Sequence, residues 1–240
     1  MIIPKKSLGQ NFLLDKNIIK KIANILKIKN KTVIEIGPGL GSLTNELIKK
    51  KPKQLIIIEK DEKLYEDLCK KLYKIDKLKI INKDILDFNF NKFTNLIIIS
   101  NLPYNISTKV IIKLFKLNKN IDEMVFMIQK ELSDKFNYNH GKINKYKFMA
   151  QLSSDYNYYF KVSSNVFFPK PKVQSAVVGF KLKQKNINWK KIEKFINIIF
   201  VNNRKKIKNK KLLKNKIIKF DNKRVDELNY YDLLKIYKSF

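Results

Sequence analysis

The chain has 240 residues, of which 44% are apolar, and a formal net charge of +31, so it can form one α/β domain with a small appendage. The single cysteine excludes an internal disulfide and fits a reducing compartment. No apolar run approaches the ~20 residues of a membrane span and no long apolar region follows Met1, so we expect a cytoplasmic protein without a membrane partner.

A surface this basic attracts polyanions, and nucleic acid is the first candidate. However, only Arg204 and Arg224 of the 52 basic residues are arginines, and lysine, asparagine and isoleucine dominate the whole chain. A coding bias toward A and T produces the same composition. The places where charge clusters are therefore more informative than its total.

The first predicted helix has Asp15 as its cap, and its apolar face carries Ile18, Ile22, Ile25 and Leu26. Before it, residues 9–13 read Gly-Gln-Asn-Phe-Leu. This stretch is either an ordinary loop with a hydrophobic anchor or a flap over a bound ligand, and its composition does not choose between them.

A glycine-rich turn at residues 37–41 follows a short apolar strand at 33–36. Ser42 is expected to cap the helix after this turn, and Ser107 to cap the helix that follows it in the sequence near residue 110. Gly37 and its neighbours let the backbone approach a ligand closely. A second strand, 55–58, ends at Glu59, which suits the hydroxyls of a ribose. NAD binders and S-adenosylmethionine binders share this pattern, although the spacing here is G-x-G-x-G rather than G-x-G-x-x-G.

Polar side chains end four successive predicted strands. Glu35 and Glu59 belong to the first two, Asp84 follows the third at 78–81, and Asn101 follows the fourth at 96–99. The carboxyl ends of parallel strands meet at one crevice. We therefore expect these four side chains to surround one ligand, and Asp84 is a candidate acceptor for the amino group of a cofactor adenine.

Residues 101–104, Asn-Leu-Pro-Tyr, suit methyl transfer to the amino group of a nucleobase. The Asn101 oxygen and the Leu102 carbonyl can accept both N–H bonds of that amine, which localises its lone pair. Pro103 restricts Leu102 to extended conformations, and Tyr104 offers a face on which a base can stack. The alternative is a strand that simply turns at a proline, with Tyr104 in the core.

Two strands near 156–162 and 177–182 are joined by a loop with two prolines, Val-Phe-Phe-Pro-Lys-Pro-Lys-Val at 166–173. A phenylalanine held by such a loop can form a second wall for a stacked base. Phe167 fits a hydrophobic anchor equally well, whereas Phe168, which directly abuts Pro169, is the better candidate for the wall.

The polar residues 184–186 separate the α/β part from a tail with helical periodicity only. We predict an α/β domain at 1–183 and a basic helical domain at 184–240. The dense basic run from Arg204 to Lys214 is the best candidate for phosphate contacts, although such a run is also compatible with a solvated face. The only histidine, His140, has no metal-ligand cluster around it, so we expect no metal.

Five stretches together closely resemble the ribosomal RNA adenine N6-dimethyltransferase family. They are Gly-Gln-Asn-Phe-Leu at 9–13, Glu-Ile-Gly-Pro-Gly-Leu-Gly at 35–41, Asn-Leu-Pro-Tyr-Asn-Ile-Ser-Thr at 101–108, Gln-Lys-Glu at 129–131 and Phe-Pro-Lys-Pro-Lys-Val-Gln-Ser-Ala-Val at 168–177. The third and fifth motifs are highly specific to this family and its relatives.

The resemblance implies an α/β, Rossmann-like S-adenosylmethionine-dependent methyltransferase sheet, mostly parallel with one antiparallel closing strand, followed by a small all-helical domain. It implies methylation of the N6 amino groups of two adjacent adenosines in the 3′-terminal hairpin of small-subunit rRNA, with a 30S-type precursor particle as partner. Donor-binding residues would be Asn11, Leu13, Gly37, Glu59, Asp84 and Asn101. Asn101, Leu102, Pro103, Tyr104 and Phe168 would hold the target base, and Lys5, Lys6, Arg204, Lys205, Lys206 and Lys208 would contact RNA.

Three alternatives remain at this stage. The antibiotic-resistance methyltransferases, which modify a large-subunit rRNA adenine, look similar. A ribosome-assembly or transcription factor could keep the fold without turnover, although it has no use for the acceptor geometry at Asn101. A nicotinamide oxidoreductase is disfavoured by the glycine spacing.

Overall fold

The computed structural model describes residues 4–5, 8–183, 186–202, 205–207, 220 and 222–240. Its main sheet has seven strands in the order β4-β3-β2-β5-β6-β9-β7. The strands are β4 (Leu78–Asn82), β3 (Gln54–Glu59), β2 (Thr32–Ile36), β5 (Leu96–Asn101), β6 (Ile121–Gln129), β9 (Ser175–Leu182) and β7 (Ser154–Val162). Only β9 runs against its neighbours in this sheet, and it lies between β6 and β7, so β7 forms the edge.

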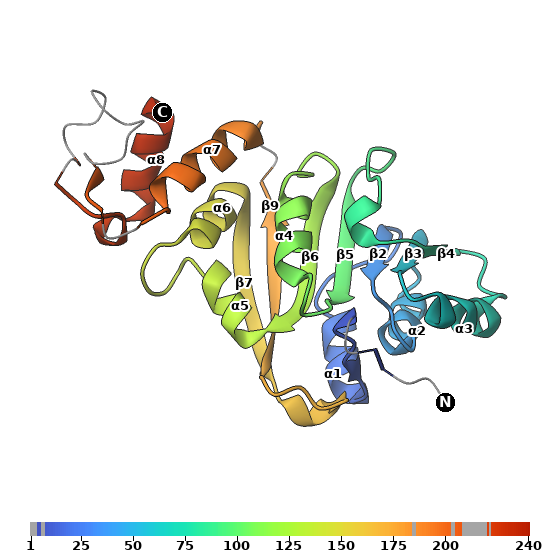
Figure 1. The fold of residues 1–240 in the computed structure, drawn as a ribbon. Helices are drawn as coiled ribbons and strands as arrows, with labels where there is room; N and C mark the ends of the chain where they lie inside the picture. Colours follow the sequence, from blue (N-terminus) through green and yellow to red (C-terminus); the bar gives the residue numbers. More distant parts are fainter. Residues whose placement is uncertain (1–3, 6–7, 184–185, 203–204, 208–219, 221) are drawn as a thin grey trace.

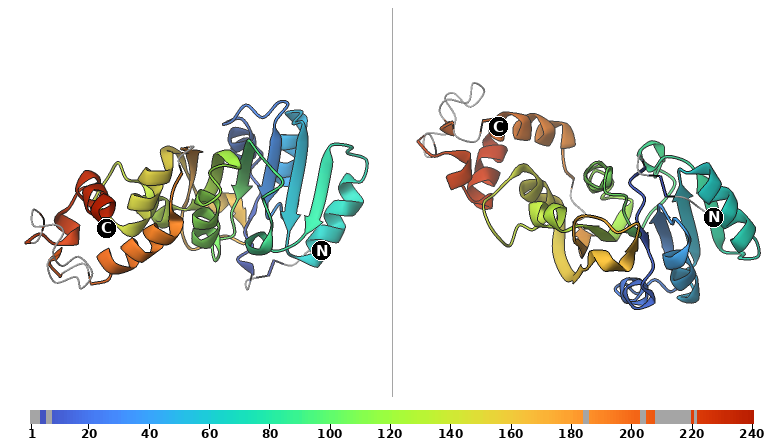
Figure 2. Two further views of the ribbon diagram at one scale, coloured as in Figure 1. Left: turned by 90° about the horizontal axis from the view of Figure 1, so that it is seen from above. Right: turned by 60° about the horizontal axis from the view of Figure 1, so that its bottom comes forward.

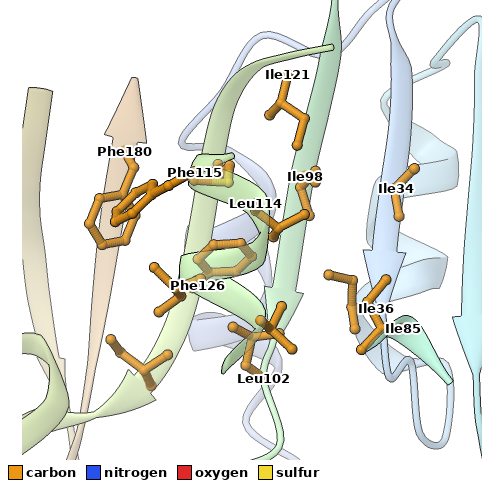
Figure 3. Packing of buried hydrophobic residues seen from close by; sticks show 14 of the residues in the cluster. Ile34, Ile36, Ile85, Ile98, Leu102, Leu114, Phe115, Ile121, Phe126 and Phe180 are labelled. Atoms are coloured by element: carbon orange, nitrogen blue, oxygen red, sulfur yellow. The ribbon is translucent and has the colours of Figure 1, made fainter. Parts of the chain in front are cut away.

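Helices cover both faces of the sheet because its central strands are apolar on both sides. Ile34, Ile56 and Ile98 face a core that includes α4 (Ser107–Phe115) and α5 (Lys130–Phe136), and Figure 3 shows this packing around Leu114 and Phe126. The strand residues between these, such as Val33, Leu55 and Ile97, point to the opposite face, which is covered by α1 (Lys16–Ala23), α2 (Ser42–Lys49) and α3 (Glu62–Leu72). A Rossmann-like layered fold results.

The helix starts depart from the sequence expectation in two places. Asp15 caps α1 as predicted, accepting from the backbone of Asn17 and Ile18. However, Ser42 and Ser107 are first helical residues rather than caps. Gly41 occupies the cap of α2 because its φ of +80° makes a turn that glycine tolerates best, and the Ser107 hydroxyl donates back to the Pro103 carbonyl.

The C-terminal part is helical, as the sequence predicts. Helices α6 (Lys145–Ser153), α7 (Trp189–Ile199) and α8 (Tyr230–Ser239) share one apolar cluster, to which α6 contributes Phe148 and Met149. These helices lie beyond the β7 edge, at the opposite end of the molecule from α3 and β4 (Figures 1 and 2). The proposed boundary at residue 184 falls outside the described residues, and α6 of the first part belongs to the helical core.

A second, two-stranded sheet joins the N-terminal segment to the proline loop. In it, β1 (Phe12–Leu13) pairs antiparallel with β8 (Phe167–Phe168), so that Phe12 lies opposite Phe168. The Leu14 amide extends the ladder by donating to the Val166 carbonyl over 2.9 Å. Two segments that are far apart in the sequence are thereby fixed beside each other.

Candidate functional site

A pocket opens at the carboxyl ends of β2, β3 and β5, where the sequence predicts the ligand crevice. Its lining includes ten residues that the sequence predicts for the donor and acceptor sites: Asn11, Leu13, Glu35, Gly37, Glu59, Asp84, Asn101, Leu102, Pro103 and Tyr104. Phe168 is not part of this lining. The tertiary structure thus brings five separate sequence segments to one site.

The glycine turn touches the walls on both sides of it. Gly37 has a φ of +62°, and an added Cβ would lie 3.5 Å from the ring of Pro103. Gly39 has a φ of +58°, and an added Cβ would lie 3.0 Å from the ring of Phe12. A larger residue would be strained at both positions because φ is positive, and at Gly39 it would also crowd the Phe12 ring.

Glu59 and Asp84 form the acidic end of the pocket, and their pKa values are shifted in opposite directions. Burial raises the pKa of Glu59, although amide hydrogen bonds from Asp61 (2.9 Å) and Gly39 (3.3 Å) oppose the shift. Burial also acts against ionisation of Asp84, but its ion pair with Lys60 at 2.8 Å and the Leu86 amide lower its pKa overall. Asp84 is therefore an anchored carboxylate.

Glu35 lies within β2 rather than beyond its end, and it is almost fully buried. Burial raises its pKa to about 8, while the hydrogen bond from the Thr44 hydroxyl at 2.6 Å opposes the rise and the charge of Glu59 adds to it. At pH 7 this pocket residue is therefore predominantly a neutral acid, which can donate a hydrogen bond.

The Asn101 side chain is oriented by the N-terminal segment. Its Nδ2 donates to the Asn11 carbonyl oxygen over 3.0 Å, which leaves Oδ1 as the acceptor of that amide. The following turn is held by the Pro103 carbonyl, which accepts from the amides of Ile106 and Ser107. The Leu102 side chain is buried, and its amide donates to the Met127 carbonyl.

The two aromatic residues proposed to hold a base differ in their surroundings. The Tyr104 hydroxyl lies 2.6 Å from the Ser175 hydroxyl on β9, and burial raises its pKa. Phe168 is 56% exposed, whereas its neighbour Phe167 is only 4% exposed and packs in the core. Phe167 is therefore a hydrophobic anchor, a choice that the sequence left open, and the Phe168 ring is accessible to a ligand.

The candidate RNA-contacting lysines are only partly described. Lys5 forms an ion pair with Asp61 at 2.8 Å and keeps about half of its side chain exposed (46%). Lys205 and Lys206 are exposed, and Lys206 makes a backbone bridge with Arg224. Lys6, Arg204 and Lys208 lie outside the described residues.

Within the described part of the chain, no group of three or more His, Cys, Asp or Glu side chains could hold a metal ion. No helix in that part is long and apolar enough to span a membrane.

Four residues that support the site were not identified from the sequence. Thr44 holds Glu35 and Ser175 holds Tyr104. Asp61 binds the N-terminal segment, and Lys113 binds the loop after Asp84. Only Asp61 carried a local signal, because it lies two residues after Glu59 at the start of a helix. The other three contacts join residues whose pairing no sequence spacing predicts.

The sequence model of the ribosomal RNA adenine dimethylase family matches residues 3–240. The chain belongs to this family. It is 42% identical over 212 residues to the ribosomal RNA small subunit methyltransferase A of Malacoplasma penetrans, an alignment that covers 85% of this chain and 76% of that protein.

Two solved structures of similar proteins confirm the predicted fold. A dimethyladenosine transferase from Plasmodium falciparum superposes with a TM-score of 0.82 at 23% identity, covering 94% of this chain and 95% of that one. The 23S rRNA methyltransferase ErmE superposes with a TM-score of 0.74 at 21% identity, covering 95% and 98%. At these identities the likeness is one of fold, and the family membership rests on the sequence.

Proposed function

We propose that this protein transfers methyl groups from S-adenosylmethionine to the N6 amino groups of two adjacent adenosines in the 3′-terminal hairpin of small-subunit rRNA. The observation that carries the proposal is the hydrogen bond from Asn101 to the Asn11 carbonyl, at the edge of a pocket that also holds Glu59 and Asp84. One continuous site thereby combines an amine acceptor with an adenosine-type pocket.

The residues at the acidic end fit the methyl donor. The Glu59 carboxylate accepts from the amides of Gly39, Lys60 and Asp61, and a carboxylate has about four acceptor positions, so it can still accept from a ribose hydroxyl. Asp84 is a suitable acceptor for the adenine amino group of S-adenosylmethionine, and Gly37, which has no side chain, would let the protein main chain approach this donor closely. Asn11 and Leu13 would lie by the methionine end of the donor. When bound, the donor supplies an electrophilic methyl group.

At the acceptor end, the Asn101 oxygen and the Leu102 carbonyl would accept the N–H bonds of the target amine. This arrangement favours a tetrahedral nitrogen, because it draws the lone pair out of the adenine ring. Tyr104 and Phe168 would enclose the base from two sides. No side chain has to act as a nucleophile, so placement and charge stabilisation supply the catalysis.

The RNA itself would be held by basic residues around and beyond the pocket. We propose Lys5, Lys6, Arg204, Lys205, Lys206 and Lys208 as phosphate contacts, on a cytoplasmic 30S-type precursor particle. Lys205 and Lys206 are exposed, as phosphate contacts must be.

The deciding experiment uses the purified full chain with tritium-labelled S-adenosylmethionine. Undermethylated small-subunit particles and large-subunit particles are incubated in parallel, and the labelled nucleotide is mapped. We expect label on two adjacent adenosines of the small-subunit 3′ hairpin, as N6,N6-dimethyladenosine. Label in large-subunit rRNA would support the resistance-type alternative. No label in either particle, with RNA binding intact, would support a non-catalytic assembly factor.

A further inference from the structure

Asp61 is a buried residue, and both of its carboxylate oxygens bind other parts of the chain. Its side chain is 3% exposed. Oδ1 caps α3 by accepting from the amides of Lys63 and Leu64. Oδ2 accepts from Lys5 Nζ at 2.8 Å and from Gln10 Nε2 at 3.2 Å.

The partners of Oδ2 belong to the described N-terminal segment, residues 4–5 and 8–14, which we call the arm. Within the arm, the Lys5 amide donates to the Gln10 side-chain oxygen at 2.7 Å, and the Leu8 amide donates to the Lys5 carbonyl at 3.1 Å. These bonds turn the arm back on itself beside Asp61, so Lys5 and Gln10 bind this carboxylate as one unit.

The arm forms one wall of the pocket, because every residue from Leu8 to Leu13 lines it. Beside the packing of Gly9 against Asn105 and of Phe12 against Gly39, the described polar contacts attach it at two places. One is the β1–β8 ladder with the adjacent bond from Asn101 to the Asn11 carbonyl. The other is Asp61. Without the second attachment, the part of the arm before Asn11 would lose its described charged contact and keep its packing against Asn105 at Gly9.

The Asp61 contact is charged, and its carboxylate is buried while the Lys5 side chain stays about half exposed. Burial alone would raise the pKa of Asp61, but Lys5, the Leu64 amide and Gln10 together lower it, so the carboxylate stays ionised at neutral pH. Charge-assisted hydrogen bonds are stronger than neutral ones. Removing the cation would also leave a buried charge without its partner.

We propose that Asp61 is a positioning residue that latches the arm over the donor pocket, through Lys5 and Gln10. The identity of the ligand as the methyl donor rests on the function proposed above. Asp61 does not itself line the pocket. It would act on donor affinity through the arm. In addition, the backbone amide of Asp61 donates one hydrogen bond to Glu59 Oε1 over 2.9 Å, which connects Asp61 to the proposed ribose-binding carboxylate.

Two variants cut the latch from opposite sides. Asp61→Asn keeps a residue that caps helices as well as Asp does, so α3 retains its start, but it removes the charge that Lys5 and Gln10 share. Lys5→Met removes the cation and keeps a long side chain. Lys16→Met is the matched control, since Lys16 is exposed at the start of α1 and forms no ion pair among the described residues.

Two quantities are measured on each purified full chain. Calorimetric titration gives the dissociation constant for S-adenosylmethionine, and hydrogen–deuterium exchange without any ligand reports on the amides of residues 8–14. We expect Asp61→Asn and Lys5→Met each to weaken donor binding about tenfold and to speed exchange in the arm. Lys16→Met should match the wild type. The double variant should bind no more weakly than Asp61→Asn alone, because both changes break one contact.

Wild-type donor affinity in both latch variants, or unchanged exchange in the arm, would overturn the proposal. If the wild type binds no S-adenosylmethionine at all, the proposed function fails, and the ligand-free exchange still decides whether Asp61 holds the arm. Should Asp61→Asn not fold, Lys5→Met and Gln10→Ala test the same contact from the arm side.

Discussion

The side-chain nitrogen of Asn101 lies 3.0 Å from the backbone carbonyl oxygen of Asn11, a residue 90 positions earlier in the chain. This bond decides which end of the amide faces the arm and which end is left to accept. The proposed catalytic oxygen is therefore oriented by main chain, and its placement depends on a segment that also lines the donor pocket.

Asn101→Ala should lower the turnover number by at least ~100-fold, since it removes an acceptor aimed at the reacting amine. Donor binding should remain measurable, because Glu59 and Asp84 stay in place. Single-turnover kinetics with labelled donor and small-subunit particles, beside donor titration, separate the two effects. Asn91→Ala, at an exposed asparagine, is the control. Near-normal turnover in Asn101→Ala would contradict the mechanism.

Phe167 and Phe168 should respond oppositely to truncation. Phe168→Ala should leave the melting temperature nearly unchanged, because the ring is 56% exposed, and should reduce methylation through the lost stacking of ~1–3 kcal/mol. Phe167→Ala should destabilise the protein by ~3–5 kcal/mol, because that ring is in the core. Thermal unfolding and methylation assays on both variants test this contrast, and equal thermal losses would refute it.

Glu35 should make stability fall as pH rises from about 4.5 to about 8. Its pKa is raised from 4.5 to about 8 by burial, so in this window the folded protein holds a proton that the unfolded chain has released. Glu35→Gln cannot ionise and can still accept from Thr44. The melting temperature of this variant, relative to wild type, should therefore increase between pH 5 and pH 8.5. Parallel curves for the two proteins would show that Glu35 does not titrate in this way.

Lys113 should hold the loop that follows Asp84. Its Nζ donates to the carbonyls of Leu86 (2.6 Å), Phe88 (3.0 Å) and Ile85 (3.1 Å), and Ile85 lines the pocket. Lys113→Met removes the lysine donor from all three carbonyls, of which Ile85 keeps the Phe88 amide, so we expect a loss of ~1–3 kcal/mol in unfolding free energy and weaker donor binding.

Lys109→Met is the matched control for Lys113→Met, because Lys109 lies one turn earlier on α4 and is exposed. Urea titration and donor titration measure the two effects. If both lysine variants behave alike, the carbonyl contacts of Lys113 have no special role.

Much of this protein could be predicted from local sequence. Continuous apolar runs such as 55–58 are buried on both faces of the sheet. The strands, and the polar residues at their ends, could therefore be predicted from the sequence. The turn at Gly37 and the residues Asn101–Tyr104 could be proposed as parts of the site because the residues that suggest their roles are adjacent in the sequence. The neighbouring proline favoured Phe168 over Phe167 as the base-stacking candidate, and Phe168 is the more exposed of the two.

Tertiary structure alone decided how these pieces meet. Nothing in the local pattern links Asn11 to Asn101, Tyr104 to Ser175 or Lys5 to Asp61, because such contacts depend on how β1 pairs with β8 and how β9 inserts between β6 and β7. The protonation of Glu35 likewise follows from burial, which depends on packing by distant segments. Sequence periodicity is a local property, whereas hydrogen-bond partners and desolvation are set by the assembled chain.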